Sequence, residues 1–348
     1  MPPKICCAIL ACSWAVSASA QEQLVSVAAT GDIMLGTDYP ENRLPDDDGA
    51  GFLAAVAPVL QAADIAIGNL EGVIVDGGEP AKTCTNPDAC FLFRSPPRYA
   101  GLLRDAGFDV LSLANNHARD FGEDGRTATM AVLDDYGLRH SGRRGDIASW
   151  MHEDLRIAFI AFSPTRESYL LNDIPTAVEE VAALAVDHDI VIVSFHGGAE
   201  GPAALELPFE EEFYFGETRG EVVRFARAVI DVGADLVLGH GPHVPRAMEL
   251  YRSRLIAYSL GNFATYYGVS VAGYAGLAPL LVAYLEPDGS FVRGRIRSAE
   301  QIRPGGPVWD AQRQAFELIR ELTERAFGGA LFEFDANGGF TAAPTSPQ

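Results

Sequence analysis

The chain is short of positive charge, has few cysteines and contains no long apolar run. It carries 26 Lys and Arg residues against 47 Asp and Glu residues, which gives a formal net charge of −21. Because a surface of that sign repels phosphate backbones and anionic headgroups, we expect no nucleic-acid partner. No run approaches the roughly 18 apolar residues of a membrane-spanning helix, so we expect no membrane span in the mature chain.

What the chain does have is enough apolar material for a large core. Hydrophobic residues make up 48% of its 348 residues, which excludes an intrinsically disordered chain. This length fits one large α/β domain or two smaller ones. Since we find no internal repeat and no interdomain linker, we expect a single domain over residues 21–327 and a flexible C-terminal tail over 328–348.

The first twenty residues have the pattern of an export signal. Lys4 supplies positive charge, residues 5–16 form a short apolar run, and residues 18–20 offer small side chains for cleavage. We therefore expect cleavage after Ala20 and a periplasmic or secreted protein. The alternative is a lipoprotein signal at Cys12, but only a handful of apolar residues precede that cysteine.

Two cysteines remain after that cleavage, Cys84 and Cys90. An even pair in an exported chain favours a disulfide, and the intervening Thr-Asn-Pro-Asp-Ala contains turn-forming residues that could bring the two sulfurs together. Two independent thiols are the alternative, which an oxidising compartment disfavours. A zinc site is poorly supported because no histidine lies nearby.

Short apolar runs alternate with helical patterns along most of the chain, which predicts an α/β fold with parallel strands buried on both faces. The expected strands cover residues 24–30, 64–68, 108–113, 156–162, 189–195 and 235–238. The expected helices cover residues 51–63, 95–106, 176–186 and 219–232, with a closing helix at 310–326. Three later runs lack intervening helices and predict a second, more antiparallel sheet: 255–260, 279–285 and 290–296.

Polar side chains follow these apolar runs where each expected strand ends, and in an open α/β sheet such ends share one crevice. Oxygen donors mixed with imidazoles suit Mn²⁺, Fe or Zn²⁺, and more than four donors suggest two ions that share a carboxylate. Taken singly, such an Asp or Asn often only caps a turn, and a lone histidine is more often hydrogen-bonded than a ligand. Their coincidence at successive strand ends favours a site for one or two divalent ions. The residues are Asp32, Asn69, Glu71, Asn115, Asn116, His117, His196, His240 and His243.

Six segments carry these residues in a fixed order: Gly-Asp-Ile-Met-Leu-Gly at 31–36, Gly-Asn-Leu-Glu-Gly at 68–72, Leu-Ala-Asn-Asn-His at 113–117, Phe-His-Gly-Gly-Ala-Glu at 195–200, Gly-His-Gly-Pro-His-Val at 239–244 and Tyr-Ser-Leu-Gly-Asn-Phe at 258–263. Together they resemble the CapA family, the bacterial poly-γ-glutamate capsule synthesis proteins related to the calcineurin-like metallophosphoesterases. The resemblance covers about residues 25–300. It implies a four-layer α/β/β/α sandwich of metallophosphoesterase type with a binuclear metal centre at one edge.

The resemblance also implies a role for each side chain. Asp32 and His243 would bind the first metal, Glu71 would bridge both metals, and the second metal would be bound by Asn116, His196 and His240. His117 would be the general acid. Arg94 lies within residues 91–96, which resemble a family segment that precedes a helix, and its guanidinium could clamp a phosphate or carboxylate, with a plain surface arginine as the alternative. Side chains expected to support the ligands are Asn69, Asn115 and Glu200.

Two departures from the superfamily pattern concern the metals. Met34 stands where metallophosphoesterases usually carry a histidine, and its thioether is a poor ligand for hard cations. The first site is therefore expected to be the weaker one. Two residues separate His240 from His243, whereas the phosphoesterases usually have one.

Three functions are compatible with such a site. The first is a metal-dependent phosphoesterase, in which the cation activates water and His117 protonates the leaving group. The second is a non-catalytic role in binding or exporting poly-γ-glutamate with the capsule synthesis machinery. The third is a metal-dependent amidase or peptidase that acts on glutamyl or cell-wall amides.

Overall fold

The computed structural model describes residues 24–81, 91–329 and 331–344. The expected export signal at 1–20 and the expected disulfide between Cys84 and Cys90 lie outside the described residues. Within the described part, no helix is both long and apolar enough to span a membrane.

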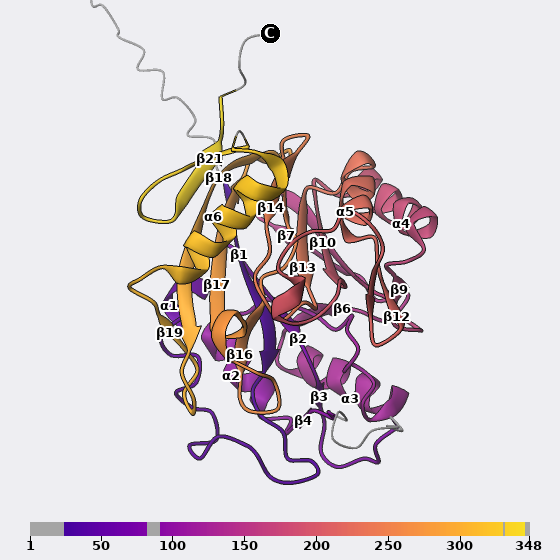
Figure 1. Ribbon diagram of the computed structural model, residues 1–348. Helices are drawn as coiled ribbons and strands as arrows, with labels where there is room; N and C mark the ends of the chain where they lie inside the picture. Colours follow the sequence, from indigo (N-terminus) through magenta and orange to yellow (C-terminus); the bar gives the residue numbers. More distant parts are fainter. Residues whose placement is uncertain (1–23, 82–90, 330, 345–348) are drawn as a thin grey trace, which may run out of the picture.

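The first of two large sheets has ten strands in the order β20-β21-β18-β17-β1-β2-β5-β6, with β16 paired to β1 and β19 to β18 (Figure 1). Strands β1, β2, β5 and β6 run parallel, whereas β17 and β18 add antiparallel neighbours beside β1. The bounds are β1 Val25–Met34, β2 Ile65–Leu70, β5 Val110–Ser112, β6 Arg139–Ser141, β16 Asn262–Thr265, β17 Leu277–Leu285, β18 Phe291–Gln301, β19 Pro307–Trp309, β20 Phe332–Phe334 and β21 Gly339–Ala342.

The second sheet has seven strands in the order β14-β15-β13-β10-β8-β7, with β9 paired to β8. Its central strands β15, β13, β10 and β8 are parallel. The bounds are β7 Ala148–His152, β8 Leu155–Ser163, β9 Tyr169–Leu170, β10 Ile190–His196, β13 Leu236–His240, β14 Met248–Tyr251 and β15 Arg254–Ala257. Two small pairs complete the strands: β3 Val73–Ile74 with β4 Arg94–Ser95, and β11 Glu212–Tyr214 with β12 Glu217–Gly220.

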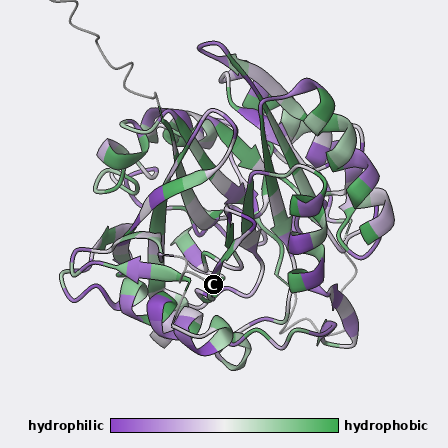
Figure 2. Cartoon of the chain, turned by 90° about the horizontal axis from the view of Figure 1, so that it is seen from above, coloured by the Kyte–Doolittle hydropathy of each residue, from purple (hydrophilic) through white to green (hydrophobic). Residues whose placement is uncertain are grey.

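The two sheets pack face to face, because apolar side chains from both, such as Ile67 and Ile192, belong to one buried cluster. A second cluster joins the outer face of the first sheet to its helices, and a third does so for the second sheet. Figure 2 shows the strands as largely green, whereas the helices mix green with purple. The expected four-layer α/β/β/α sandwich is therefore confirmed. The helices are α1 Ala57–Leu60, α2 Tyr99–Ala106, α3 Gly122–Asp135, α4 Ile174–Asp187, α5 Val222–Asp231 and α6 Gln314–Phe327, with short 3-10 turns at Pro202–Ala204 and Gly273–Gly276.

The antiparallel strands are placed differently from the expectation. They do not form a separate sheet: β17 pairs antiparallel with β1 and extends the first sheet, while β15 runs parallel to β13 in the second. Almost every residue of β17 is buried, so this strand has apolar neighbours on both of its faces. Of the helix expected over 51–63, only the short α1 is formed. The sequence pattern does not predict α3, because two glycines and two threonines interrupt its apolar residues.

The C-terminal segment also differs from the expectation of a flexible tail over 328–348. Its described part forms β20 and β21, and β21 pairs with β18. Phe332 and Phe340 are buried, and the ring of Phe340 stacks on that of Phe291 with centroids 5.4 Å apart. Gly and Pro in this segment suggested mobility, but its alternating aromatic residues close one end of the core between the sheets.

We predict that Phe340→Ala lowers the free energy of unfolding by about 3–5 kcal/mol, because it removes a fully packed aromatic ring. The matched control is Thr341→Ala, an exposed neighbour on the same strand, which should change stability by less than about 0.5 kcal/mol. Urea unfolding followed by circular dichroism measures both. Equal midpoints for the two variants would show that β21 contributes nothing to the core.

Candidate metal centre

The carboxyl ends of parallel strands from both sheets meet at one edge of the sandwich. Asp32 lies near the end of β1, beside Asn69 of β2, and Glu71 directly follows β2. From the second sheet, His196 and His240 end β10 and β13 and are paired in register. The first sheet thus supplies carboxylates and amides, and the second supplies imidazoles.

Local backbone geometry explains the Gly-Asp dipeptide at the end of β1. A Cβ on Gly31 would lie 1.9 Å from the carbonyl oxygen of Gly261, so only glycine allows this close approach. The next residue, Asp32, donates its backbone N–H to the same carbonyl over 2.9 Å. This contact fixes the Asp32 carboxylate against the segment that precedes β16.

Asp32 and His243 form the tightest charged contact of the cluster. Oδ2 of Asp32 lies 3.0 Å from Nδ1 of His243, and Oδ1 accepts a hydrogen bond from Asn69 over 2.8 Å. Burial by itself would raise the pKa of Asp32, but the facing imidazoles of His240 and His243 outweigh it and hold that pKa well below its usual range. The Asp32 carboxylate is therefore ionised.

His243 is held in an uncommon backbone conformation, with φ of 58°. Its Nε2 faces Oε1 of Glu71 at 3.7 Å and Oε2 of Glu200 at 3.8 Å. Burial would lower the pKa of His243, but the carboxylates of Glu71 and Asp32 raise it to about 10. Asp32, Glu71 and His243 each offer a ligand atom within 4.8 Å of one another, a spacing that can hold a metal ion.

Glu71 is fully buried, and neither of its carboxylate oxygens has a hydrogen-bond partner among the described residues. Burial raises its pKa to about 7, against the opposing charge of His243. Oε1 of Glu71 also lies 4.0 Å from Nε2 of His196. A buried carboxylate without donors is costly unless a cation neutralises it.

The remaining donors are buried and lack partners in the same way. Within the part of the chain that the structure describes, Nε2 of His196, both ring nitrogens of His240 and Oδ1 of Asn116 have no hydrogen bond. Burial lowers the pKa of His196 well below its usual value, so its ring is neutral and keeps a lone pair. Nδ1 of His240 approaches Oδ1 of Asp32 at 3.6 Å, which is too long for a hydrogen bond. Unpartnered oxygens and neutral nitrogens are the donor types that transition-metal cations take.

Amide side chains connect these donors to the backbone. Asn115 donates to Oδ1 of Asn69 over 3.1 Å and to the carbonyl of Leu70 over 2.8 Å. Asn262 lies beside Asp32 in the β1–β16 pairing, and its Oδ1 is 3.0 Å from Nδ1 of His243. Glu200, the other expected supporting residue, pairs with Arg219 at 3.0 Å.

His117 lies at the rim of the cluster and is mostly buried. Its Nδ1 is 2.8 Å from Oδ2 of Asp120, and its ring packs on Phe93 with centroids 4.4 Å apart. Its backbone N–H donates to Asn115 over 3.0 Å. These contacts fix the ring and leave Nε2 as its second polar atom.

Two residues singled out from the sequence make other contacts. Nε of Arg94 donates to Asp38 over 2.6 Å, and its guanidinium lies over the rings of Tyr39 and Phe121. No described contact joins Arg94 to the metal cluster. Met34 is buried, and its sulfur accepts a hydrogen bond from the backbone N–H of Gly36 over 3.3 Å.

Sequence analysis did not assign roles to Asp120 and Asn262. Asp120 follows His117 by three residues, a spacing that brings both side chains to one side of a turn. Asn262 stands in the Gly-Asn-Phe segment at 261–263, whose local sequence indicates no ligand role. Its register with Asp32 depends on β16 pairing with β1, which no local pattern reveals.

Comparisons with known proteins agree on one family. A sequence model of the family described as "Bacterial capsule synthesis protein PGA_cap" matches residues 26–267. "Capsule biosynthesis protein CapA" of Bacillus anthracis is 26% identical over 281 residues, covering 75% of this chain and 66% of that protein. "PGA biosynthesis protein CapA" of Bacillus subtilis is 27% identical over 259 residues, covering 70% and 63%. The chain thus spans less than two thirds of either relative.

Among solved structures, a 5'-nucleotidase precursor from Thermus thermophilus aligns with a TM-score of 0.44 and 13% sequence identity. The alignment covers 86% of this chain and 59% of that chain.

We predict that cation affinity rises with pH, because protons compete for the ligands. At pH 7 the His243 ring, with its pKa raised to about 10, holds a proton, and Glu71, with its pKa raised to about 7, is about half protonated. Binding of Mn²⁺ or Zn²⁺ should therefore release roughly one to two protons. Calorimetry in two buffers of different ionisation enthalpy measures this number.

The variant Glu71→Gln has no carboxylate to ligate a cation, so its affinity should fall at least about 10-fold. The exposed Glu317→Gln on α6 serves as the matched control and should bind like the unmodified protein. Unchanged affinity in Glu71→Gln would exclude this carboxylate as a ligand.

Proposed function

Because the chain belongs to the PGA_cap family of bacterial capsule synthesis proteins, we propose that it is an exported metal-dependent phosphoesterase that acts in capsule synthesis. The observation that carries the proposal is Glu71, a buried carboxylate whose two oxygens lack any hydrogen bond within the described residues while imidazoles face it. A divalent cation supplies the missing partner for these atoms. With no cation, only the protonated His243 ring, 3.7 Å from Oε1, would offset the desolvation of Glu71, and Nε2 of His196 would have no partner among the described residues.

The donor set divides between two cations. Asp32, Glu71 and His243 would hold the first, and Glu71 would also reach the second. The additional ligands of the second cation would be Asn116, His196 and His240. This mixture of oxygen and imidazole nitrogen suits Mn²⁺, Fe or Zn²⁺, and Met34 adds no hard donor to the first site.

A bound cation supplies Lewis acidity, which polarises a phosphoryl oxygen and lowers the pKa of water. The chain itself supplies the proton for the leaving oxygen, and His117 is the group assigned to this transfer. Asp120 holds Nδ1 of His117, and Phe93 supports one face of the ring, which leaves Nε2 as the atom that would transfer the proton. Asp120 acts as a positioning residue for His117.

Amide hydrolysis and non-catalytic binding of a polymer are the competing functions. Both use the same cation, either to polarise a carbonyl or to hold a carboxylate. Non-catalytic binding differs from the proposal in what His117 does, since binding alone requires no proton transfer. Amide hydrolysis would also use a proton donor and differs in the bond that is cleaved.

We predict that His117→Ala lowers the hydrolysis rate of an alkyl phosphomonoester by about 10²–10⁴-fold, the usual contribution of a general acid. The loss on 4-nitrophenyl phosphate should be much smaller, because nitrophenolate leaves without protonation. Asp120→Asn should shift the pH profile on the alkyl ester while retaining part of the rate.

Metal content by elemental analysis is the control, and it should stay unchanged in His117→Ala. Equal losses on both esters, or loss of metal, would make His117 a ligand or structural residue. If no phosphoester is hydrolysed even with added Mn²⁺, Fe²⁺ or Zn²⁺, the polymer-binding or amidase function replaces the phosphoesterase.

Export is part of the same proposal. Residues 1–20 would direct the chain out of the cytoplasm and be removed after Ala20, and the oxidising compartment would then join Cys84 to Cys90. The proposed cleavage is supported by the order of positive charge, apolar run and small residues in residues 1–20. The proposed disulfide is supported by the pair of cysteines that would remain in the mature chain.

We predict that the mature chain begins at Gln21 and contains no free thiol. Intact-mass spectrometry of the exported protein gives the cleavage position, and alkylation after unfolding without reductant should add no mass. Alkylation after reduction should add two groups. A lipid-modified Cys12 would contradict the cleavage site, and two alkylated thiols without reductant would contradict the disulfide.

A further inference from the structure

A hairpin close to the metal centre carries a largely exposed aromatic ring at its tip. Strands β11 and β12 are joined by the two residues Phe215 and Gly216, and Phe215 is 86% exposed. Among the described residues, no other large apolar side chain is as exposed. The ring of Phe215 lies against that of Tyr214, with centroids 4.4 Å apart and planes inclined by 56°. Tyr214 and Phe215 thus form an angled ring pair that is open to solvent at Phe215.

The backbone at the tip disfavours phenylalanine. Phe215 and Gly216 have φ of 47° and 80°, the pattern of a type I′ turn. Asn or Asp followed by Gly is preferred in such a turn, because a bulky side chain is strained at positive φ. A phenylalanine that is both strained and exposed contributes nothing to folding or solubility. A ligand that covers the ring explains its presence.

The base of the hairpin is held rigidly. Glu212 of β11 accepts two hydrogen bonds from Arg246, over 2.9 and 2.7 Å, and both side chains are buried. Oε2 of Glu212 also accepts a hydrogen bond from the backbone N–H of Ala199 over 2.9 Å. A fixed base presents the ring pair in one orientation, which reduces the entropy that is lost when a ligand binds.

The hairpin is connected to the metal centre through Arg219 of β12. The guanidinium of Arg219 lies 5.5 Å from the ring centroid of Tyr214 and 3.0 Å from Oε1 of Glu200. Oε2 of Glu200 in turn lies 3.8 Å from Nε2 of His243. A ligand on the ring pair therefore lies close to the metal cluster.

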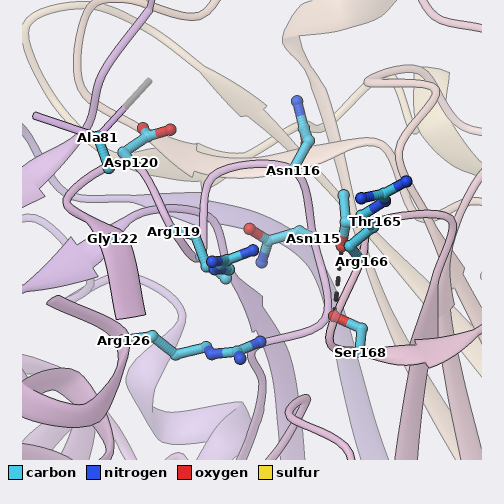
Figure 3. A pocket seen from close by; sticks show the side chains of 11 residues that line it. Ala81, Asn115, Asn116, Arg119, Asp120, Gly122, Arg126, Thr165, Arg166 and Ser168 are labelled. Atoms are coloured by element: carbon cyan, nitrogen blue, oxygen red, sulfur yellow. Dashed lines mark hydrogen bonds between the residues drawn. The ribbon is translucent and has the colours of Figure 1, made fainter. Parts of the chain in front are cut away.

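The pocket of about 290 Å³ that Asn116 lines offers a different surface. Figure 3 shows amide, hydroxyl and arginine side chains on its walls, and none of its described lining residues is aromatic. A ligand ring thus finds a stacking surface at the hairpin and not in this pocket.

Size and charge restrict what can cover the ring pair. The two rings offer at most roughly 400 Å², about half of the 800 Å² that a stable protein interface covers on each partner. The exposed carboxylates of Glu210, Glu211 and Glu217 lie on the hairpin or directly before it, and they repel an anionic ligand or membrane surface. The ligand is therefore small and uncharged, and it carries hydrogen-bond donors for these carboxylates.

The angle between the rings favours a puckered ligand ring over a flat one. A flat nucleobase can stack on only one of two rings whose planes differ by 56°. A pyranose chair has C–H bonds on its face and on its edge, so it can contact both rings. Its hydroxyl groups can donate to a carboxylate, and Glu217 lies opposite Tyr214 in the hairpin.

We propose that the β11–β12 hairpin binds a neutral glycan, with one pyranose ring against Tyr214 and Phe215 and a hydroxyl group on Glu217. Glucose or N-acetylglucosamine units in β-1,4 linkage fit this surface, because their equatorial substituents leave a face of axial C–H bonds free for the aromatic rings. The hairpin brings such a sugar chain beside the metal centre. Binding needs neither a cation nor hydrolysis, so failure of the phosphoesterase would not alter it.

Cellotetraose and chitotetraose test the proposal on the protein as purified, and neither contains a phosphoester that could be turned over. In saturation-transfer NMR, we expect the strongest signals at the axial ring protons H1, H3 and H5, which mark the face against the aromatic rings. Phe215→Asn should weaken binding at least about 10-fold in calorimetry. It should also raise the melting temperature by about 1–2 °C, because Asn relieves the strained turn.

The matched control is Phe213→Asn on the same hairpin. Phe213 is 58% exposed, but it pairs with Thr218, which places it on the face opposite to Tyr214. This variant should bind both tetrasaccharides as the unmodified protein does. Phe215→Tyr keeps an aromatic ring and should retain the affinity within about 3-fold.

Four outcomes would overturn the assignment. The first two are that neither tetrasaccharide binds, or that Phe215→Asn and Phe213→Asn bind them equally. The third is a lower melting temperature in Phe215→Asn, which would make the ring a part of the folded core. The fourth is adenosine binding more tightly than either tetrasaccharide and being lost in Phe215→Asn, which would make the ring pair a nucleobase site.

Discussion

The desolvation of Glu71 is the constraint on which the site depends. A carboxylate that loses water and gains no hydrogen bond is stable only when positive charge lies close to it. The first sheet delivers this carboxylate and Asp32, whereas the imidazoles that face them come from the second sheet. The site therefore exists only when the two sheets are packed together. The apolar cluster between them holds the carboxylates of the first sheet opposite the imidazoles of the second.

Strand ends were predictable from the sequence because buried strands are recognisable as apolar runs. Asp32, Glu71, His196 and His240 each follow such a run, and the parallel topology of both sheets brings them to one edge. This part of the site could be predicted without knowing which strands pair, because the carboxyl ends of parallel strands lie at the same edge of a sheet.

The partners that orient these groups could not be predicted in the same way. Asn262 reaches His243 only because β16 pairs with β1. In the same way, β17 joins the first sheet because it pairs with β1, and the sequence of β17 does not indicate that partner. The C-terminal aromatics were misjudged for a related reason. Phe332 and Phe340 stand among Gly and Pro, and their packing on Phe291 becomes visible only in three dimensions.

The backbone conformation of His243 limits which residues can replace it. At a φ of 58°, β-branched and bulky side chains are strained, whereas Asn, Asp and His adopt such angles more readily than other residues besides glycine. An amide or a carboxylate is therefore the replacement for the imidazole that keeps both this backbone and a ligand atom. Either replacement exchanges nitrogen for oxygen, so that a single substitution hardens the ligand set toward Mn²⁺ or Mg²⁺ without rebuilding the loop.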